Sequence, residues 1–148
     1  MSDLDLMGAL SRLEGAVSAL RSRLRDQLGV SAGDLTVIQF VARAEAAHRT
    51  VRVKDLATHL GLTGPAVTGL VDRLERAGHL CRVPNPDDGR SRHIELTPST
   101  RQAYTVAMDG TNSLLHELMA SFSERDRARF VRIVDRVIAA IDHGSPGS

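Results

Sequence analysis

Apolar side chains recur at helical spacing in two short segments near the middle of the chain. The recurring positions are Val53, Leu56, Ala57 and Leu60 in residues 53–61, and Val67, Leu70, Val71 and Leu74 in residues 64–77. Both series follow the 3.6-residue period that places side chains on one face of a helix. Thr63 suits the N-cap of the second helix, and Gly78 suits a left-handed cap after it. Two short helices about a Gly-containing turn form a helix-turn-helix pattern, and the second helix is the candidate reader of the major groove of DNA.

Two short segments after the second helix predict a β-hairpin. Residues 79–83 and 92–96 suit strands, and residues 84–90 between them are rich in Pro, Asn, Asp and Gly, which favour turns. A hairpin that follows a helix-turn-helix is a wing, so the pattern predicts a winged helix. Residues 50–52 suit a further short strand that joins this hairpin.

Longer amphipathic helices are predicted on both sides of the winged helix. Leucine and valine recur at spacings of three and four over residues 4–28, and Ser31 suits the N-cap of a second helix that ends near Ala47–His48. After the wing, Pro98 suits the first turn of another long helix, and Ser123 suits the cap of the last one. The predicted fold class is therefore mainly α with a small β-hairpin wing.

The length of the chain, 148 residues, suits one domain with a buried core. We expect a single domain over residues 1–148, with a DNA-binding lobe at about 33–97, dimerisation helices at about 4–30 and 98–142, and a disordered tail at 143–148. Aromatic residues make up only 3% of the chain, so packing must rest on Leu, Val, Ile and Ala.

The outer helices each carry a full apolar stripe, and one small winged-helix core cannot cover all of them. Exposed apolar stripes of this size mark an association surface. We therefore expect a two-fold homodimer in which these helices interdigitate, the alternative being an intramolecular three-helix cluster. The expected interface residues are Leu6, Leu10, Leu13, Val17, Leu118, Phe130, Ile133, Val137 and Ile141. Such a dimer presents two recognition helices to successive major grooves, about 34–36 Å apart, and prefers a pseudo-palindromic site.

Charge is distributed unevenly along the chain, although the net charge is only +1. Residues 48–101 carry nine Lys and Arg against six Asp and Glu, whereas the segments before and after each carry five against six. The positive excess thus lies on the segment that is expected to contact DNA, where attraction to phosphates requires it.

The sequence predicts a cytoplasmic protein. A single cysteine excludes an intramolecular disulfide framework, and the acidic start of the chain lacks the basic and then apolar order of a signal peptide. No apolar run approaches the length of a membrane span, so we expect no membrane partner.

The start of the second short helix carries small side chains away from its buried stripe, which allows close approach to phosphates and thymine methyls. The candidate DNA contacts there are Thr63, Gly64, Pro65, Ala66, Thr68 and Gly69. Arg73 is the long cation one turn further on and is a further candidate. The alternative for Arg73 is a surface ion pair with Asp72 or Glu75.

The wing supplies a second set of candidate contacts. Arg90, at a Gly-containing tip, is placed to enter a narrow and electronegative minor groove. Asp88 is expected to hold the Arg90 guanidinium by a paired hydrogen bond, and Arg92 is expected to contact a phosphate. The alternative is a solvent-exposed hairpin with a weak salt bridge.

Two stretches resemble the MarR-type (multiple-antibiotic-resistance regulator) transcription factors. They are the run from Leu56 to Leu80 and the wing string from Asp88 to Thr97. The wing pattern of that family is Asp-x-Arg, then Leu-Thr six residues after the Arg, and the chain keeps this spacing. The order of the helices extends the resemblance to residues 4–142. Gly64 and Gly69 stand where the family often has hydrogen-bonding side chains.

The resemblance implies a homodimeric, sequence-specific transcriptional regulator, and we expect a repressor. It further implies that a small aromatic or phenolic effector binds between the dimer helices and the DNA-binding lobe and releases DNA by a population shift. In this chain the first, second and fifth helices would border that cleft.

Other constellations are weak. His79, Cys81 and His93 come from facing strands and allow a metal site to be drawn, but a small thiol and two imidazoles on a hairpin need no metal. Redox sensing at Cys81 lacks a nearby base that lowers the thiol pKa. We expect no cofactor, no metal and no enzymatic activity, because no nucleophile, phosphate-loop or metalloprotease motif is present.

Two other functions fit the same pattern. A winged helix that serves as a protein-interaction module predicts that Arg90 is dispensable. A DNA-binding protein that needs no ligand predicts binding that no small molecule reverses.

Overall fold

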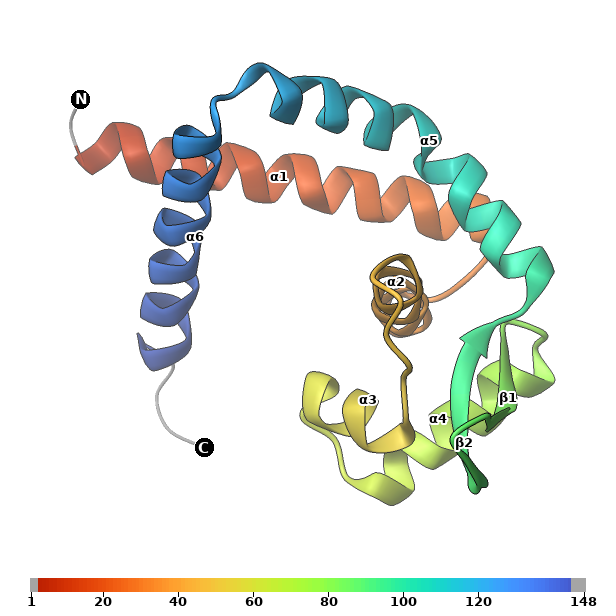
Figure 1. Cartoon of the computed structure of the whole chain (residues 1–148). Coiled ribbons are helices and arrows are strands. Elements are labelled where there is room, and N and C mark those ends of the chain that lie inside the picture. The colour runs from red at the N-terminus through yellow and green to blue at the C-terminus, as the bar shows by residue number, and fades with distance from the viewer. Residues whose placement is uncertain (1–2, 145–148) are drawn as a thin grey trace. The chain divides into compact units, whose positions relative to one another are not determined.

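The computed structural model describes residues 3–144 of the chain (Figure 1). It forms two compact units, Met1–Met108 and Asp109–Ser148, and the division falls inside helix α5 (Pro98–Ser121). Six helices and one antiparallel hairpin are present in the described part, which confirms the predicted fold class of helices with a small wing.

Helices α1 (Asp3–Leu28) and α2 (Ala32–Ala46) pack against each other in the first unit. The predicted cap of α2 is present: Ser31 Oγ accepts the N–H of Asp34 at 3.2 Å, and Asp34 Oδ2 accepts the N–H of Ser31 at 3.3 Å. This reciprocal pair satisfies two amides that the first turn would otherwise leave unpaired. α2 ends at Ala46, next to the predicted end.

Helices α3 (Val53–Leu60) and α4 (Gly64–Arg76) form the helix-turn-helix and pack on each other (Figure 1). Gly61 ends α3 with a φ of 64°, a left-handed conformation that glycine adopts without strain. Thr63 caps α4 as predicted, because its Oγ1 accepts the N–H of Ala66 at 3.4 Å. Gly78, with a φ of 81°, turns the chain from α4 into the wing.

The wing consists of β1 (Leu80–Asn85) and β2 (Asp88–Leu96), which pair from Leu80 with Leu96 to Asn85 with Asp88. Both strands extend further toward the tip than the sequence pattern predicts, since Pro84 pairs with Arg92. Proline is tolerated there because β1 pairs with β2 alone and the missing amide proton of Pro84 need not enter a second ladder. The predicted strand at residues 50–52 is an isolated bridge between Val51 and Ile94.

One hydrophobic core holds these elements of the first unit together. It is built from α2, the two helices of the helix-turn-helix and the root of the wing, and its fully buried members include Val37, Ile38, Val41, Leu56, Val67, Val71, Leu74, Leu80 and Leu96. Burying each such side chain contributes about 1.5–3 kcal/mol relative to leaving it in water. The core therefore fixes one face of α4 and leaves the opposite face free.

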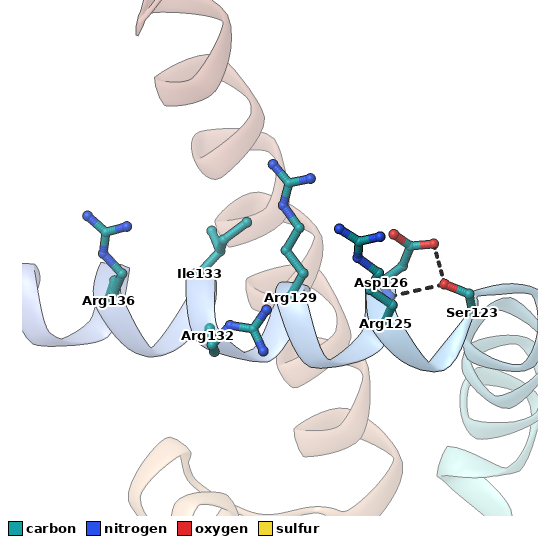
Figure 2. A pocket seen from close by; sticks show the side chains of 7 residues that line it. All are labelled: Ser123, Arg125, Asp126, Arg129, Arg132, Ile133 and Arg136. Carbon is teal, nitrogen blue, oxygen red and sulfur yellow. Dashed lines mark hydrogen bonds between the residues drawn. The ribbon is translucent and has the colours of Figure 1, made fainter.

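Helix α5 begins at Pro98, as the sequence predicts, and is capped by Thr97, whose Oγ1 accepts the N–H of Thr100 at 3.3 Å. Helix α6 (Glu124–Gly144) is capped by Ser123, whose Oγ donates to Asp126 Oδ2 at 2.6 Å and accepts the Asp126 N–H at 3.1 Å (Figure 2). α6 continues two residues into the expected tail, and residues 145–148 lie outside the described part.

The outer helices expose much apolar surface. None of the described residues of α6 is buried. Seven of the nine predicted interface residues are largely exposed within one chain, and Leu10 and Val137 are half-buried. No helix in the described range is both long enough and apolar enough to cross a membrane.

Candidate nucleic-acid interface

The outward face of α4 is made of small, exposed side chains. All ten residues that the sequence predicts as DNA contacts are exposed, namely Thr63, Gly64, Pro65, Ala66, Thr68, Gly69, Arg73, Asp88, Arg90 and Arg92. Apart from the adjacent residues and the backbone of the helix itself, no described atom comes within 4 Å of a Cβ built on Gly64 or Gly69. Packing inside the chain therefore does not require glycine at either position, and the backbone of α4 is open to a partner.

Arg73 does not pair with Asp72 or Glu75, the partners that its alternative interpretation names. Its guanidinium makes two parallel hydrogen bonds to the carboxylate of Asp34 in α2, one of them 3.2 Å from Nη1 to Oδ2. Asp34 is buried, and its pKa is lowered from the ordinary value, chiefly by the hydrogen bond from Arg73. Arg73 is thus held by a carboxylate 39 residues away in the sequence.

Asp72 and Glu75 bind a different arginine, Arg82 of β1. Arg82 Nη2 lies 2.5 Å from Asp72 Oδ1, and Arg82 Nη1 binds Glu75 Oε2. These two ion pairs tie the wing to the exposed side of α4. Helical and strand periodicity carry no signal for this contact, because it depends on how β1 packs against α4.

The tip of the wing is organised by Asn85, a buried residue that the sequence pattern assigns only to a turn. Asn85 Oδ1 accepts the N–H of Asp87 at 3.1 Å, and Asn85 Nδ2 donates to Ser91 Oγ at 3.2 Å. Asp88 Oδ1 accepts the backbone N–H of Arg90 at 3.0 Å, so the expected bond from Asp88 to the Arg90 guanidinium is corrected to a bond to the backbone. The tip is held by its own polar groups, and the Arg90 side chain extends from an ordered backbone.

A second polar network joins the root of the wing to α5. Glu45 of α2 accepts the N–H of Leu96 at 2.9 Å and two hydrogen bonds from the Arg101 guanidinium, at 2.9 and 3.2 Å. Arg101 in turn donates to the carbonyl oxygen of Leu96 at 3.0 Å. No sequence pattern indicates the contact between Glu45 and Arg101, which lie 56 residues apart and belong to no local motif.

The three candidate metal ligands are engaged elsewhere. His79 Nδ1 lies 3.1 Å from Thr100 Oγ1, and His93 Nε2 lies 2.7 Å from Glu95 Oε1. Within residues 3–144 no group of three His, Cys, Asp or Glu side chains could hold a metal ion. Burial, together with the charge of Glu95, raises the pKa of the Cys81 thiol. A raised thiol pKa leaves little thiolate and does not favour redox sensing.

Hollows lie on the surface of the described chain, including a pair of different size. One, of about 840 Å³, runs along α6 and is lined by Ser123, Arg125, Asp126, Arg129, Arg132, Ile133 and Arg136 (Figure 2). The other, of about 420 Å³, is lined by residues of α2, α3 and the segment between them, among them Phe40 and His59, whose ring centroids are 4.3 Å apart. The effector cleft expected between the first, second and fifth helices stays a prediction.

Comparison with known proteins agrees with this geometry. The model of the MarR family matches residues 28–91. The transcriptional activatory protein BadR of Rhodopseudomonas palustris is 32% identical over 127 residues, which cover 80% of this chain and 72% of BadR.

Solved structures share the fold. The transcription regulator MarR from Oenococcus oeni PSU-1 has a TM-score of 0.64 at 18% identity, covering 90% of this chain and 98% of that one. The S. aureus MepR–DNA complex has a TM-score of 0.55 at 17% identity, covering 88% of this chain and 96% of MepR. MarR-family transcription regulators are non-enzymatic DNA-binding proteins, which confirms the expectation that this chain is not an enzyme. The match to the family model, the identity to BadR and the shared fold together show that the chain belongs to the MarR family of winged helix-turn-helix transcriptional regulators.

Proposed function

We propose that two copies of this chain bind a pseudo-palindromic DNA site, with α4 of each copy in the major groove and Arg90 of each wing in the minor groove. The observation that carries this proposal is the two-sided character of α4. Val67, Val71 and Leu74 fix one face in the core, while the opposite face, from Thr63 to Gly69, is exposed and small. A helix with that profile fits a groove without a steric barrier.

The wing adds a positive contact beside this helix. Arg90 is exposed, and the hydrogen bonds of Asn85 and Asp88 order the backbone from which it extends. An ordered backbone reduces the entropy that is lost when the arginine enters the minor groove. Arg92, also exposed, is the proposed phosphate contact.

The proposed dimer uses the exposed stripes of α1, α5 and α6. Leu13, Leu118 and Ile133 expose 57%, 49% and 47% of their surface in a single chain, which is unfavourable in water. A second copy that covers these stripes removes that surface from solvent and sets the spacing of the two recognition helices.

Regulation is proposed to follow from occupancy of the site. A dimer on its operator excludes other proteins from the same DNA, so we propose a cytoplasmic repressor that a small aromatic or phenolic effector releases. BadR carries the name of an activator. We infer that the position of the site relative to the promoter decides whether binding represses or activates transcription.

Arg90→Ala tests the proposal. A duplex site is first selected from random DNA with the wild-type protein, and affinities for it are measured across a salt series. We expect steep salt dependence for the wild type and a loss of about 1–3 kcal/mol for Arg90→Ala. Arg23→Ala, which removes the same charge from an exposed position on α1, is the matched control and should bind nearly as tightly as the wild type.

Two outcomes contradict the proposal. Failure of the wild type to select or bind any duplex at low salt favours the protein-interaction module. An equal loss for Arg90→Ala and Arg23→Ala means that only overall charge, and not the wing, is important.

A further inference from the structure

The carboxylate of Asp34 links the first turn of α2 to the middle of α4. Asp34 Oδ2 accepts the N–H of Ser31 at 3.3 Å and Arg73 Nη1 at 3.2 Å, and Asp34 Oδ1 accepts Arg73 Nη2. Paired hydrogen bonds between a guanidinium and a carboxylate fix both distance and angle, which a single contact between charges does not. The pair therefore constrains the orientation of α4 relative to α2.

The burial of the two partners is unequal. The Asp34 side chain exposes 10% of its surface, whereas the Arg73 side chain exposes 53%. A buried carboxylate needs a partner that compensates for its lost hydration, and Arg73 supplies it. Arg73 is accordingly committed to Asp34, although its exposure alone would mark it as a candidate for a phosphate contact.

The same turn of α2 is also attached to α1. Arg21 Nη2 of α1 donates a hydrogen bond of 2.7 Å to Thr36 Oγ1, two residues after Asp34. The first turn of α2 thus contacts both a predicted dimerisation helix and the recognition helix. The Asp34–Arg73 pair connects this turn directly to α4.

We propose that Asp34 and Arg73 are positioning residues of the DNA site, which set the angle of α4 against α2, and that Arg73 makes no contact with DNA. The inference rests on the proposed DNA-binding function and deepens it. It reassigns Arg73 from a DNA contact to an internal partner, and it adds Asp34, an acidic residue outside the helix-turn-helix.

The two roles of Arg73 predict opposite effects of changing Asp34. If Arg73 contacts a phosphate, Asp34→Asn removes a negative charge and releases the arginine, so DNA binding is unchanged or stronger. If the pair positions α4, Asp34→Asn loosens the recognition helix, so binding to the specific site is weaker.

The experiment compares Asp34→Asn, Arg73→Ala and the double variant on the selected duplex and on a scrambled duplex. We expect each single variant to weaken binding to the selected duplex by about tenfold, and the double variant to be no weaker than the weaker single one. The salt dependence and the affinity for the scrambled duplex should stay close to those of the wild type. Asp26→Asn, at an exposed position of α1, is the control for loss of one negative charge.

Arg73→Lys distinguishes the effect of the paired hydrogen bonds from the effect of the positive charge. It also provides a second test of the pair if Asp34→Asn folds poorly. Lysine retains the charge but cannot form the paired hydrogen bonds, so we expect it to weaken binding as alanine does. All affinities are measured at a temperature where circular dichroism shows the variants to be folded.

Three results overturn the inference. They are wild-type affinity or better in folded Asp34→Asn, wild-type affinity in Arg73→Lys, and a salt slope that falls by about one in Arg73→Ala, as loss of a phosphate contact requires. Failure of the wild type itself to bind DNA instead contradicts the proposed function, so the two failures are distinguishable.

Discussion

Asp34 should also make the stability of the protein depend on pH in the acid range. The hydrogen bond from Arg73 lowers the pKa of Asp34 from the ordinary value of 3.8. Its contribution to the free energy of unfolding is fully present above that value and is lost as pH falls through the lowered folded pKa. We expect Asp34→Asn to cost about 1–3 kcal/mol near neutral pH and to cost less at about pH 3.

Urea unfolding of the wild type and of Asp34→Asn at the two pH values measures this difference. Asp26→Asn should show no comparable loss at either pH, because the Asp26 side chain is exposed. A cost of Asp34→Asn that stays constant down to pH 3 would mean that folding does not lower the pKa of Asp34.

At the scale of single residues, sequence predicts the contacts that are local along the chain. The caps at Ser31, Thr63 and Ser123 follow from side chains that reach amides three residues on. The partners of Arg73 and Arg82 do not follow in this way, because they depend on how α2 and β1 pack against α4. The hydrogen bond between Asp88 and the Arg90 backbone could not be predicted for a different reason. The Asp88 carboxylate can accept from either the guanidinium or the backbone N–H of Arg90, because both are close in sequence, and only the conformation of the tip decides between them.

At the scale of elements, Gly69 and Gly78 are predicted to respond in opposite ways to alanine. Gly69 lies inside α4, and no described atom beyond the adjacent residues and the helix backbone is within 4 Å of a Cβ built there, so Gly69→Ala should stabilise the helix by about 0.5–1 kcal/mol. Gly78 has a φ of 81°, which strains alanine, so Gly78→Ala should destabilise the protein by about 1–2 kcal/mol. Thermal unfolding of both variants shows whether each substitution raises or lowers the stability of the protein.

The DNA affinity of Gly69→Ala then shows whether glycine at this position is needed for the close approach of DNA to the backbone of α4. If the backbone of α4 approaches DNA at this position, Gly69→Ala binds the selected duplex more weakly although it is more stable. Equal or tighter binding would place Gly69 outside the contact surface. Gly78→Ala is the matched comparison, since it changes a glycine outside the exposed start of α4.

The positions of the elements follow from sequence more closely than their ends. Periodic apolar residues and caps locate α3 and α4 to within about one residue, since the end of α3 and both ends of α4 are marked by Thr, Gly or Pro. The strands of the wing are longer than predicted because Pro84 was assigned to the turn. A two-stranded hairpin has free edges, and a free edge tolerates proline.

At the scale of the whole molecule, the sequence predicts which apolar surfaces a single chain leaves exposed, but it does not predict what covers them. The apolar stripes of α1, α5 and α6 are visible in the sequence, and their exposure in one chain agrees with the packing argument. The network of Glu45, Leu96 and Arg101 has no such periodic signal, although it joins α2, the wing and α5. Such polar contacts become apparent only once the core has placed their elements.

The proposed dimer makes Ile133 the most informative position on α6. Ile133→Glu puts a charge into a surface that a second copy is expected to cover, and burying an unpaired carboxylate is strongly unfavourable. We expect the wild type to be a dimer at micromolar concentration in sedimentation equilibrium and the variant to be monomeric. Ala139→Glu is the control, because two residues correspond to about 200° around a helix and Ala139 therefore lies opposite Val137 and Ile141.

The monomer must also bind DNA differently. One copy covers one half-site and contacts about half of the phosphates, so the salt slope of Ile133→Glu should fall to about half that of the wild type. If the apolar stripes instead form an intramolecular cluster, the wild type is itself a monomer, and Ile133→Glu lowers the unfolding temperature without changing the salt slope. Association state and salt slope must therefore change together, because in a dimer the surface that joins two chains also sets the number of phosphates they contact.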